Sequence, residues 1–333
     1  MNRLTSAGRL GAALAAILLL GWTSPSRAAT EGFDVRDAGE FGKCVDPASA
    51  KLRKLAGGLK FVEGPVWVPS AAAAAGEAGG VLVFSDIPGN ALMKYDPAEP
   101  DEKKRLSTYR TPSEYTNGNA IDAEGRLIHA CHGLRCVQRS GKDGKVETLV
   151  ETVDGKRFNS PNDVVVAKDG AIYFTDPPYG VPKGQQRELD YHGVFRFDPA
   201  AKKLTVLAKD VQFPNGIALS PDGKTLYVAR SDPKEPVIRA YDLKPDGTLG
   251  DGKDLCRIEK GGPDGIRVDA DGRIWSSGGD GVSVFSPAGK LLGKILVPEV
   301  PANLAFGGKD GRTLFVTART GLYAIDVKVG GVK

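Results

Sequence analysis

The chain has 333 residues, of which 41% are hydrophobic and 26% charged, and its formal net charge is +4. This is the composition of an ordinary globular protein, and its length is compatible with one large domain. The charges are spread along the chain without a run of five of one sign, so a nucleic-acid groove is not expected.

The first 28 residues differ from the rest. Arg3 and Arg9 belong to a charged start, residues 10–22 are apolar, and Ser26 and Ala28 are small residues at the recognition positions of a cleavage site. This pattern predicts a secretory signal peptide at residues 1–28, and the apolar stretch is too short to span a bilayer. We therefore expect a mature chain of residues 29–333 that works in the periplasm or outside the cell.

The mature chain contains four cysteines, Cys44, Cys131, Cys136 and Cys256. Four cysteines in an exported chain allow three disulfide pairings. A local Cys131–Cys136 bridge and a Cys44–Cys256 bridge are one solution, and four free buried thiols are the other. Cys131, His132 and Cys136 alone do not make a zinc pattern, because no second CxxC or HxxxH accompanies them.

From residue 63 onward a short pattern occurs six times. An oxygen-bearing side chain begins an apolar run, and in the last five copies a glycine follows eight residues after this start. A second β-rich run follows the glycine. The six starting positions are Glu63, Asn117, Asn162, Asn215, Asp264 and Asn303. A fixed register repeated at intervals of about fifty residues indicates radial repetition.

Almost every segment after residue 63 has the composition of a β-strand. Residues 172–174, 226–228 and 314–317 are rich in β-branched and aromatic side chains, and Asp-Gly or Glu-Gly dipeptides separate the runs. Units of about four antiparallel strands repeated six times predict an all-β, six-bladed β-propeller. A pair of β-sandwiches would not explain the constant spacing. Residues 30–59 are expected to add an outer strand beside the last blade, and residues 327–333 are expected to fray.

In a closed ring the six starting positions meet at one mouth of the central channel. Two carboxylates, Glu63 and Asp264, and two amides, Asn162 and Asn215, then offer the oxygen ligands that calcium prefers. Single Asn or Asp residues often only begin strands or make Asx turns, but six in register favour a metal site. The strands that return to this mouth would bring His132, Asp176 and Tyr179 to the same rim.

The runs around these residues resemble one known family. They are FVEGPVW at 61–67, RFNSPND at 157–163, FTDPPYG at 174–180, FPNG at 213–216 and GPDGIRV at 262–268. Over residues 63–323 the chain is similar to the gluconolactonase family, the senescence-marker-protein/regucalcin-like group with luciferin-regenerating enzyme as a relative. The resemblance implies a six-bladed propeller and a metal held by Glu63, Asn215 and Asp264.

The resemblance also implies roles for single residues. Asn162 would border or join the metal and contact substrate, as in more distant arylesterase propellers with four comparable calcium ligands, and Asp264 would also transfer the proton. Animal members carry an arginine where this chain has Ser160, and an acidic residue where it has the PPYG loop of bacterial members. Their substrate contacts therefore do not transfer, and the identity of the lactone stays open.

The expected function is hydrolysis of a sugar lactone such as gluconolactone. A divalent metal, calcium with zinc or manganese as alternatives, would polarise the carbonyl, and Asp264 would serve as base with His132 or Asp176 as alternatives. Hydroxyls of the lactone would bond Asn117, Asn162, Arg157 and Tyr179.

Two other functions stay open at this point. One is a secreted propeller that binds a ligand or partner around a structural calcium, and the other is hydrolysis of another ester or of a phosphotriester. The sequence contains no G-x-S-x-G elbow and no phosphate loop or dinucleotide fingerprint. A small-molecule partner and a monomer or weak dimer are expected, without nucleic acid and without a membrane span.

Overall fold

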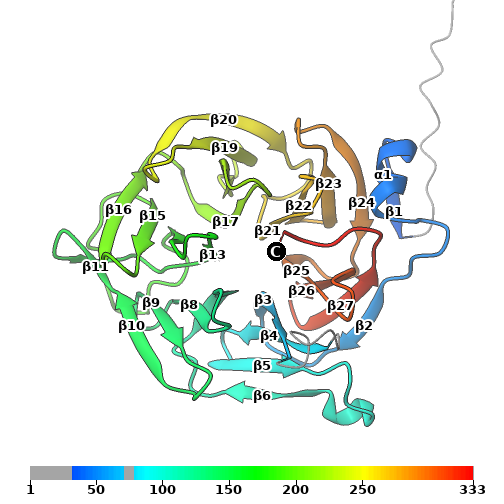
Figure 1. Cartoon of the computed structure of the whole chain (residues 1–333), viewed down its shortest axis with the longest axis horizontal. Helices are drawn as coiled ribbons and strands as arrows, with labels where there is room; N and C mark the ends of the chain where they lie inside the picture. Colours follow the sequence, from blue (N-terminus) through cyan, green and yellow to red (C-terminus); the bar gives the residue numbers. More distant parts are fainter. Residues whose placement is uncertain (1–31, 71–78, 333) are drawn as a thin grey trace, which may run out of the picture.

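The computed structural model describes residues 32–70 and 79–332 and has the predicted fold. Six β-sheets stand like blades around a central channel (Figure 1). The all-β, six-bladed propeller is therefore confirmed. The predicted signal peptide, residues 1–28, lies outside the described residues.

The first three blades follow one another in sequence from the channel outward. Blade 1 contains β3 (Val62–Pro69), β4 (Gly80–Asp86), β5 (Ala91–Tyr95) and β6 (Leu106–Arg110). Blade 2 contains β7 (Thr116–Ile121), β8 (Leu127–Cys131), β9 (Cys136–Ser140) and β10 (Val146–Val150). Blade 3 contains β13 (Val164–Val166), β14 (Ile172–Asp176), β15 (Gly193–Asp198) and β16 (Lys203–Ala208). A hairpin of β11 (Thr152–Val153) and β12 (Lys156–Arg157) connects blades 2 and 3.

The last three blades keep the same order. Blade 4 contains β17 (Pro214–Leu219), β18 (Thr225–Arg230), β19 (Val237–Leu243) and β20 (Leu249–Arg257). Blade 5 contains β21 (Ile266–Val268), β22 (Ile274–Gly278), β23 (Gly281–Phe285) and β24 (Leu291–Leu296). Blade 6 contains β25 (Pro301–Gly307), β26 (Thr313–Ala318) and β27 (Gly321–Asp326).

The N-terminal segment completes the last two blades. Strand β2 (Arg53–Ala56) pairs antiparallel with β27 and gives blade 6 its fourth strand, and β1 (Phe33–Val35) pairs with β24 at the edge of blade 5. Helix α1 (Ala38–Cys44) lies between them in sequence. The expected outer strand beside the last blade is confirmed, and blade 6 is built from both ends of the propeller sequence.

Apolar side chains fill the spaces between blades. Phe158, Phe174 and Phe195 form a buried aromatic cluster with ring centroids 5.0–5.2 Å apart. Trp67 of blade 1 stacks on Phe315 of blade 6 at 5.5 Å. Contacts of this kind give the ring a close-packed interior, so the inner strands are held in fixed positions around the channel.

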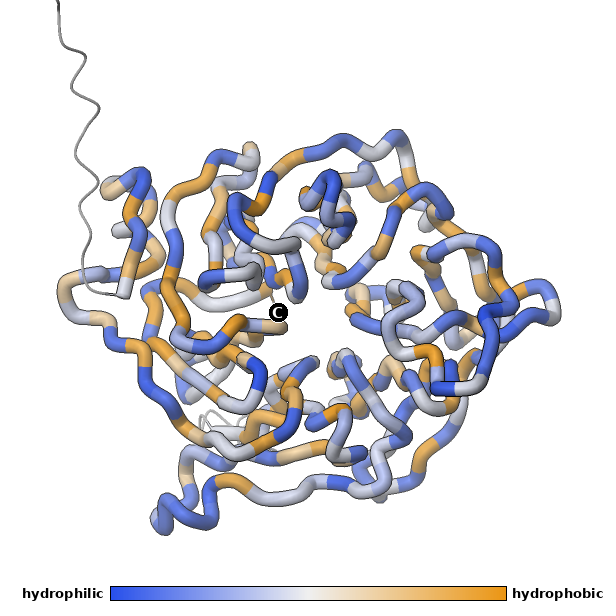
Figure 2. The backbone as a smooth tube through the Cα atoms, turned by 180° about the vertical axis from the view of Figure 1, so that it is seen from behind, coloured by the Kyte–Doolittle hydropathy of each residue, from blue (hydrophilic) through white to orange (hydrophobic). Residues whose placement is uncertain are grey.

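The end of the chain is ordered against the channel. Gly331 forms an antiparallel bridge with Asp269, and the amide of Val332 donates to the carbonyl of Val268 at 3.1 Å. The C-terminus therefore lies near the centre of the ring (Figures 1 and 2). The expectation that residues 327–333 fray is wrong for 327–332, because blade 5 offers backbone groups that pair with this segment.

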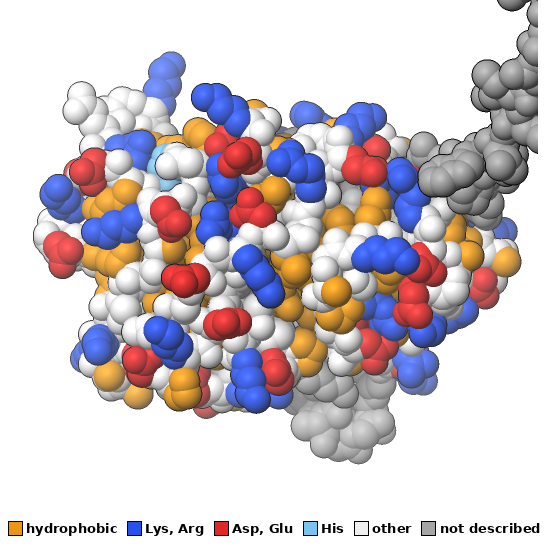
Figure 3. Space-filling model, turned by 90° about the horizontal axis from the view of Figure 1, so that it is seen from above, with side chains coloured by type: hydrophobic (Ala, Val, Ile, Leu, Met, Phe, Trp, Pro, Cys, Tyr) orange, Lys and Arg blue, Asp and Glu red, His pale blue; other side chains and the backbone are white. Residues whose placement is uncertain are grey.

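The surface carries charges of both signs (Figure 3), and the thiols are buried. The face in Figure 3 carries Lys and Arg side chains interspersed with Asp and Glu. Within residues 32–70 and 79–332, no helix is long and apolar enough to cross a membrane. The four cysteines are buried with free thiols, and Cys131 and Cys136 are register partners on β8 and β9.

Candidate active site at one mouth of the channel

The six starting positions, hereafter the ring positions, lie where the inner strands begin. The residue after the ring position is glycine in four blades: Gly64, Gly118, Gly216 and Gly265. A Cβ on Gly216 would lie 2.2 Å from the carbonyl oxygen of Asp264, and one on Gly64 would lie 2.0 Å from that of Asn117. Side chains do not fit here, so the glycines let neighbouring ring positions approach each other.

Backbone hydrogen bonds then connect one blade to the next at this mouth. The amide of Gly118 donates to the carbonyl of Asn162 at 2.7 Å, and the amide of Gly216 donates to that of Asp264 at 3.0 Å. These backbone hydrogen bonds bring neighbouring ring positions together at one mouth of the channel, as the sequence predicted.

Hydroxyl groups from the second strand of a blade support the same mouth. Ser85 donates to the carbonyl of Asn117 at 2.7 Å, Thr175 to that of Asn215 at 2.7 Å, and Ser277 to that of Ala302 at 2.7 Å. Each hydroxyl reaches from one blade to the next. These three hydroxyls were not predicted from the sequence, although a Ser or Thr near the end of the return strand was a readable signal.

Two carboxylates come together at the mouth. Glu63 is 4% exposed, and its Oε2 accepts from the amide of Gly64 at 2.7 Å and from Asn303 Nδ2 at 3.0 Å. Burial raises the pKa of Glu63 to about 7, and the Asp163 carboxylate contributes. Asp264 keeps part of its surface accessible. Desolvation raises its pKa well above the usual value, and the charges of Glu63 and Asp163 add to this. Such mutual repulsion disappears when a cation lies between the groups.

Amide oxygens surround the carboxylates. Asn162 and Asn215 are buried, and Asn215 is hydrogen-bonded to Asp264. Asn117 places its Nδ2 at 3.3 Å from His132 Nε2, while its buried Oδ1 has no hydrogen-bond partner. A buried acceptor without a donor is rare.

This donor set fits a hard divalent cation, because it combines two neighbouring carboxylates with carbonyl oxygens. Among the described residues, no group of three or more His, Cys, Asp or Glu side chains has a metal-holding arrangement. The mixed carboxylate and amide set remains the candidate.

His132 and Tyr179 lie at the same mouth. His132 is 7% exposed and faces Asn117, and burial lowers its pKa to about 4. Tyr179 is half exposed and stacks on Phe213, with centroids 5.9 Å apart. Desolvation raises the pKa of Tyr179, and the neighbouring Asp264 carboxylate contributes.

Neither Asp176 nor Arg157 has a functional group that is free to contact a substrate at the mouth. Both oxygens of Asp176 accept backbone amides, from Asn159 and Ser160 at 2.7 Å each, and the side chain is fully buried. Burial raises its pKa to about 7 against the effect of these bonds. Arg157 Nη2 donates to the carbonyl of Leu134 at 2.8 Å. Both side chains hold loops of the rim.

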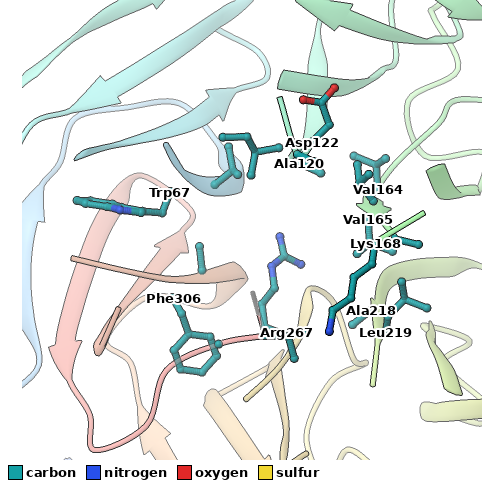
Figure 4. Close-up of a pocket in the computed structure, with 18 of the residues that line it drawn as sticks. Trp67, Ala120, Asp122, Val164, Val165, Lys168, Ala218, Leu219, Arg267 and Phe306 are labelled. Carbon is teal, nitrogen blue, oxygen red and sulfur yellow. The ribbon is translucent and has the colours of Figure 1, made fainter. Parts of the chain in front are cut away.

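The large cavity of the channel lies at the opposite mouth. It has a volume of about 1510 Å³ and is lined by inner strands and the turns that follow them, among them Trp67, Val164, Lys168, Leu219 and Phe306 (Figure 4). We call it the distal cavity. None of the six ring positions lines it, so it is separate from the candidate site.

Comparisons with known proteins identify relatives that are similar to most of this chain. The gluconolactonase of Zymomonas mobilis is 33% identical over 309 residues, which is 85% of this chain and 83% of that protein. A 6-deoxy-6-sulfogluconolactonase of Pseudomonas putida is 31% identical over 72% of this chain and 79% of its own length. The solved gluconolactonase of Xanthomonas campestris is 36% identical, with a TM-score of 0.79 over 88% of this chain and 94% of that one.

The family model described as SMP-30/Gluconolactonase/LRE-like region matches residues 61–320. This range contains all six ring positions and all six inner strands. The resemblance noted in the sequence is thus confirmed, and the chain belongs to the SMP-30/gluconolactonase/LRE-like family.

Proposed function

We propose that the protein hydrolyses a sugar lactone, such as gluconolactone, at the mouth formed by the ring positions, with the help of a divalent cation. The observation that carries the proposal is the pair of mutually repelling carboxylates, the buried Glu63 and the partly accessible Asp264, set among amide oxygens. Relatives similar along most of the chain are named gluconolactonase and 6-deoxy-6-sulfogluconolactonase, which supports the substrate class.

The residues that would hold the cation are Glu63, Asn162, Asn215 and Asp264. Their oxygens suit calcium best, with zinc and manganese as alternatives. When bound, the cation supplies positive charge that polarises the lactone carbonyl and stabilises the negative charge developing on its oxygen.

Asp264 is the proposed base, because it is the ring carboxylate with accessible surface. It takes a proton from the water that attacks the carbonyl carbon. The ring C–O bond of the lactone then breaks, and the proton passes to the departing alkoxide oxygen. The product is the open hydroxy acid, and Asp264 returns to its carboxylate form.

His132 and Asp176 take supporting roles in this proposal. A pKa of about 4 leaves His132 neutral and weakly basic near pH 7, so its contribution is to orient the Asn117 amide. Asp176 fixes the backbone of Asn159 and Ser160, which precede Asn162. Both remain the alternative bases if Asp264 is only a ligand.

The substrate would lie on the open side of the ring positions. Asn117 and Asn162 offer amide groups to sugar hydroxyls, and the exposed ring of Tyr179 on Phe213 offers an aromatic surface for the sugar. Arg157 contributes through the loop that contains Leu134, to which its guanidinium is bonded.

The experiment is a panel of sugar lactones incubated with purified protein before and after exhaustive chelation. Hydrolysis that disappears on chelation and returns with calcium, zinc or manganese supports the proposal. Full activity with no metal left by elemental analysis contradicts the metal dependence. Binding of a ligand at the mouth without hydrolysis of any ester would instead favour a binding propeller with a structural calcium. Hydrolysis of a phosphotriester or another ester alone would change the substrate class.

We further propose that the protein is exported and acts as a monomer or weak dimer. The basis of the first part is the sequence of residues 1–28. N-terminal sequencing of the protein from the periplasm or medium is expected to begin near Ala29. An intact Met1 in a cytoplasmic fraction would contradict export.

A further inference from the structure

The glycine that follows the ring position is replaced in two blades, and one of the two replacements is charged. After the ring position, four blades carry glycine and blade 6 carries Leu304, but blade 3 carries Asp163. Asp163 is 1% exposed, and its Oδ1 accepts from the amide of Val164 at 3.0 Å. A buried carboxylate is costly without a partner, so its presence next to two other carboxylates needs a compensating charge.

Arg267 provides this charge from another blade. Its Nη1 lies 3.4 Å from Asp163 Oδ2 and donates to the carbonyl of Ile266 at 2.7 Å, and its Nη2 donates to the carbonyl of Pro65 at 3.4 Å. The guanidinium therefore contacts groups of blades 1, 3 and 5. Figure 4 shows the side chain pointing into the channel, and Arg267 also lines the distal cavity. The Asp163–Arg267 pair thus lies between the ring positions and the distal cavity.

The charged side chains at the floor and at the ring positions are close enough to influence one another. The Asp163 carboxylate acts on both Glu63 and Asp264, and the Arg267 guanidinium acts on Glu63. An arginine stays protonated throughout the useful pH range. Three carboxylates and one guanidinium, when all are ionised, leave two negative charges, which is the charge that one divalent cation neutralises.

We propose that Asp163 and Arg267 form the floor of the candidate metal site and tune its affinity for a divalent cation in opposite directions. Asp163 attracts the cation, and Arg267 opposes it while it holds Asp163 in place. Neither residue needs to touch the cation, so both are positioning residues. This inference rests on the proposed function, because it assumes that a divalent cation binds at the ring positions.

The test is titration of the chelated whole chain with calcium by calorimetry, for wild type and four variants. Asp163→Asn keeps the shape and the Val164 bond but removes a negative charge, so we expect the dissociation constant to rise on the order of tenfold. Arg267→Met removes the positive charge, and we expect tighter binding by a similar factor. Arg267→Lys keeps the charge and is expected to stay near wild type.

The double variant Asp163→Asn/Arg267→Met is the decisive control. Its charge equals that of the wild type, so its affinity is expected to return toward the wild-type value and to complete a double-mutant cycle. Weaker binding in both single variants, or no change in either, would overturn the inference, because a merely structural ion pair would act in that way. Circular dichroism checks that each variant folds. If Arg267→Met does not fold, the two single variants Asp163→Asn and Arg267→Lys are compared, and only Asp163→Asn is expected to weaken calcium binding.

The wild type separates this inference from the proposed function. If the wild type binds calcium but Asp163→Asn and Arg267→Met do not change the calcium affinity in opposite directions, only the proposed role of the floor is wrong. If it hydrolyses lactones yet binds none of calcium, zinc or manganese, the metal site itself fails, and the role of the floor fails with it.

Discussion

At the scale of single residues, Asp264 has two proposed tasks that one substitution can separate. Asp264→Asn keeps an oxygen that can face the cation but removes the base. Loss of a general base costs on the order of 10²–10⁴ in rate, so kcat at saturating metal is expected to fall by this factor. Metal content and circular dichroism should stay near the wild-type values.

Asn303→Ala is the matched control for Asp264→Asn. Asn303 is a ring position that donates to Glu63 but lies outside the proposed ligand set, so its loss should have a milder effect on kcat. Complete rescue of Asp264→Asn by extra metal would show that Asp264 is only a ligand. Of the two alternatives, His132 would then be the base, because both oxygens of Asp176 accept backbone amides.

The protonation of Glu63 predicts how metal binding depends on pH. Burial raises its pKa from an ordinary 4.5 to about 7 in the metal-free protein, and a cation binds the carboxylate form. Calcium affinity is therefore expected to increase between pH 5 and about pH 7 and then level off. Binding near pH 6 should release protons, which calorimetry in two buffers of different ionisation enthalpy measures. A pH-independent affinity would contradict the role of Glu63.

The same pKa shift predicts the stability of the metal-free protein. The folded state binds the Glu63 proton more tightly than the unfolded state, so the free energy of unfolding should decrease as pH rises from about 4.5 to about 7. Above that window the contribution is lost, and added metal should restore stability. Urea unfolding with and without calcium at both ends of the window checks the sign.

At the scale of strands, the glycines after the ring positions have a steric role that can be measured. Gly216→Ala would place a methyl group 2.2 Å from the carbonyl of Asp264. We expect a loss of about 1–3 kcal/mol in the free energy of unfolding, as for other overpacked sites, together with weaker metal binding. Denaturant unfolding and calcium titration measure the two effects.

Gly42→Ala is the control for Gly216→Ala. Gly42 lies in helix α1, and a Cβ there meets no atom within 4 Å. Alanine is favoured over glycine in helices by up to about 1 kcal/mol, so this variant should be as stable as the wild type or more stable. Equal losses in both variants would mean that the close approach at the ring positions has no special cost.

Sequence periodicity predicted what depends on local pattern. The positions of Asn162, Asn215 and Asp264 at the starts of inner strands followed from the spacing of the glycine turns, and so did the number of blades. The pairing of Asp163 with Arg267 did not, because 104 residues separate them and only the closure of the ring brings them together.

The two alternative bases show another limit of the sequence. Their position in the repeat placed Asp176 and His132 at the rim, but it did not reveal that Asp176 is bonded to two backbone amides. A sequence does not show whether the oxygens of a carboxylate are free or already accept backbone hydrogen bonds. The hydroxyl of Ser85, which supports the next blade, was also missed, although its place near the end of the return strand could be read from the sequence.

At the scale of the whole molecule, the N-terminal segment joins the first and last parts of the ring. Phe33, Phe41 and Val45 are buried in one apolar cluster with side chains of blades 5 and 6. Strand β2 covers the edge of β27 through the pairing of Arg53 with Ala324. A chain that starts after this segment would lose both the cluster and the closing strand.

The last prediction compares two truncated chains. A chain of residues 29–333, the proposed mature form, keeps β1, α1 and β2 and is expected to unfold in one cooperative transition. A chain of residues 57–333 keeps all six ring positions but exposes the edge of β27 and loses the buried side chains of Phe33, Phe41, Cys44 and Val45. Burial of these side chains is worth roughly 5 kcal/mol or more. This is comparable to the net stability of a typical domain, and an exposed strand edge promotes aggregation. Soluble yield and thermal unfolding of the two chains measure the difference. If the shorter chain is as stable as the longer one and binds calcium equally well, ring closure by the N-terminal segment is not needed to hold the site together.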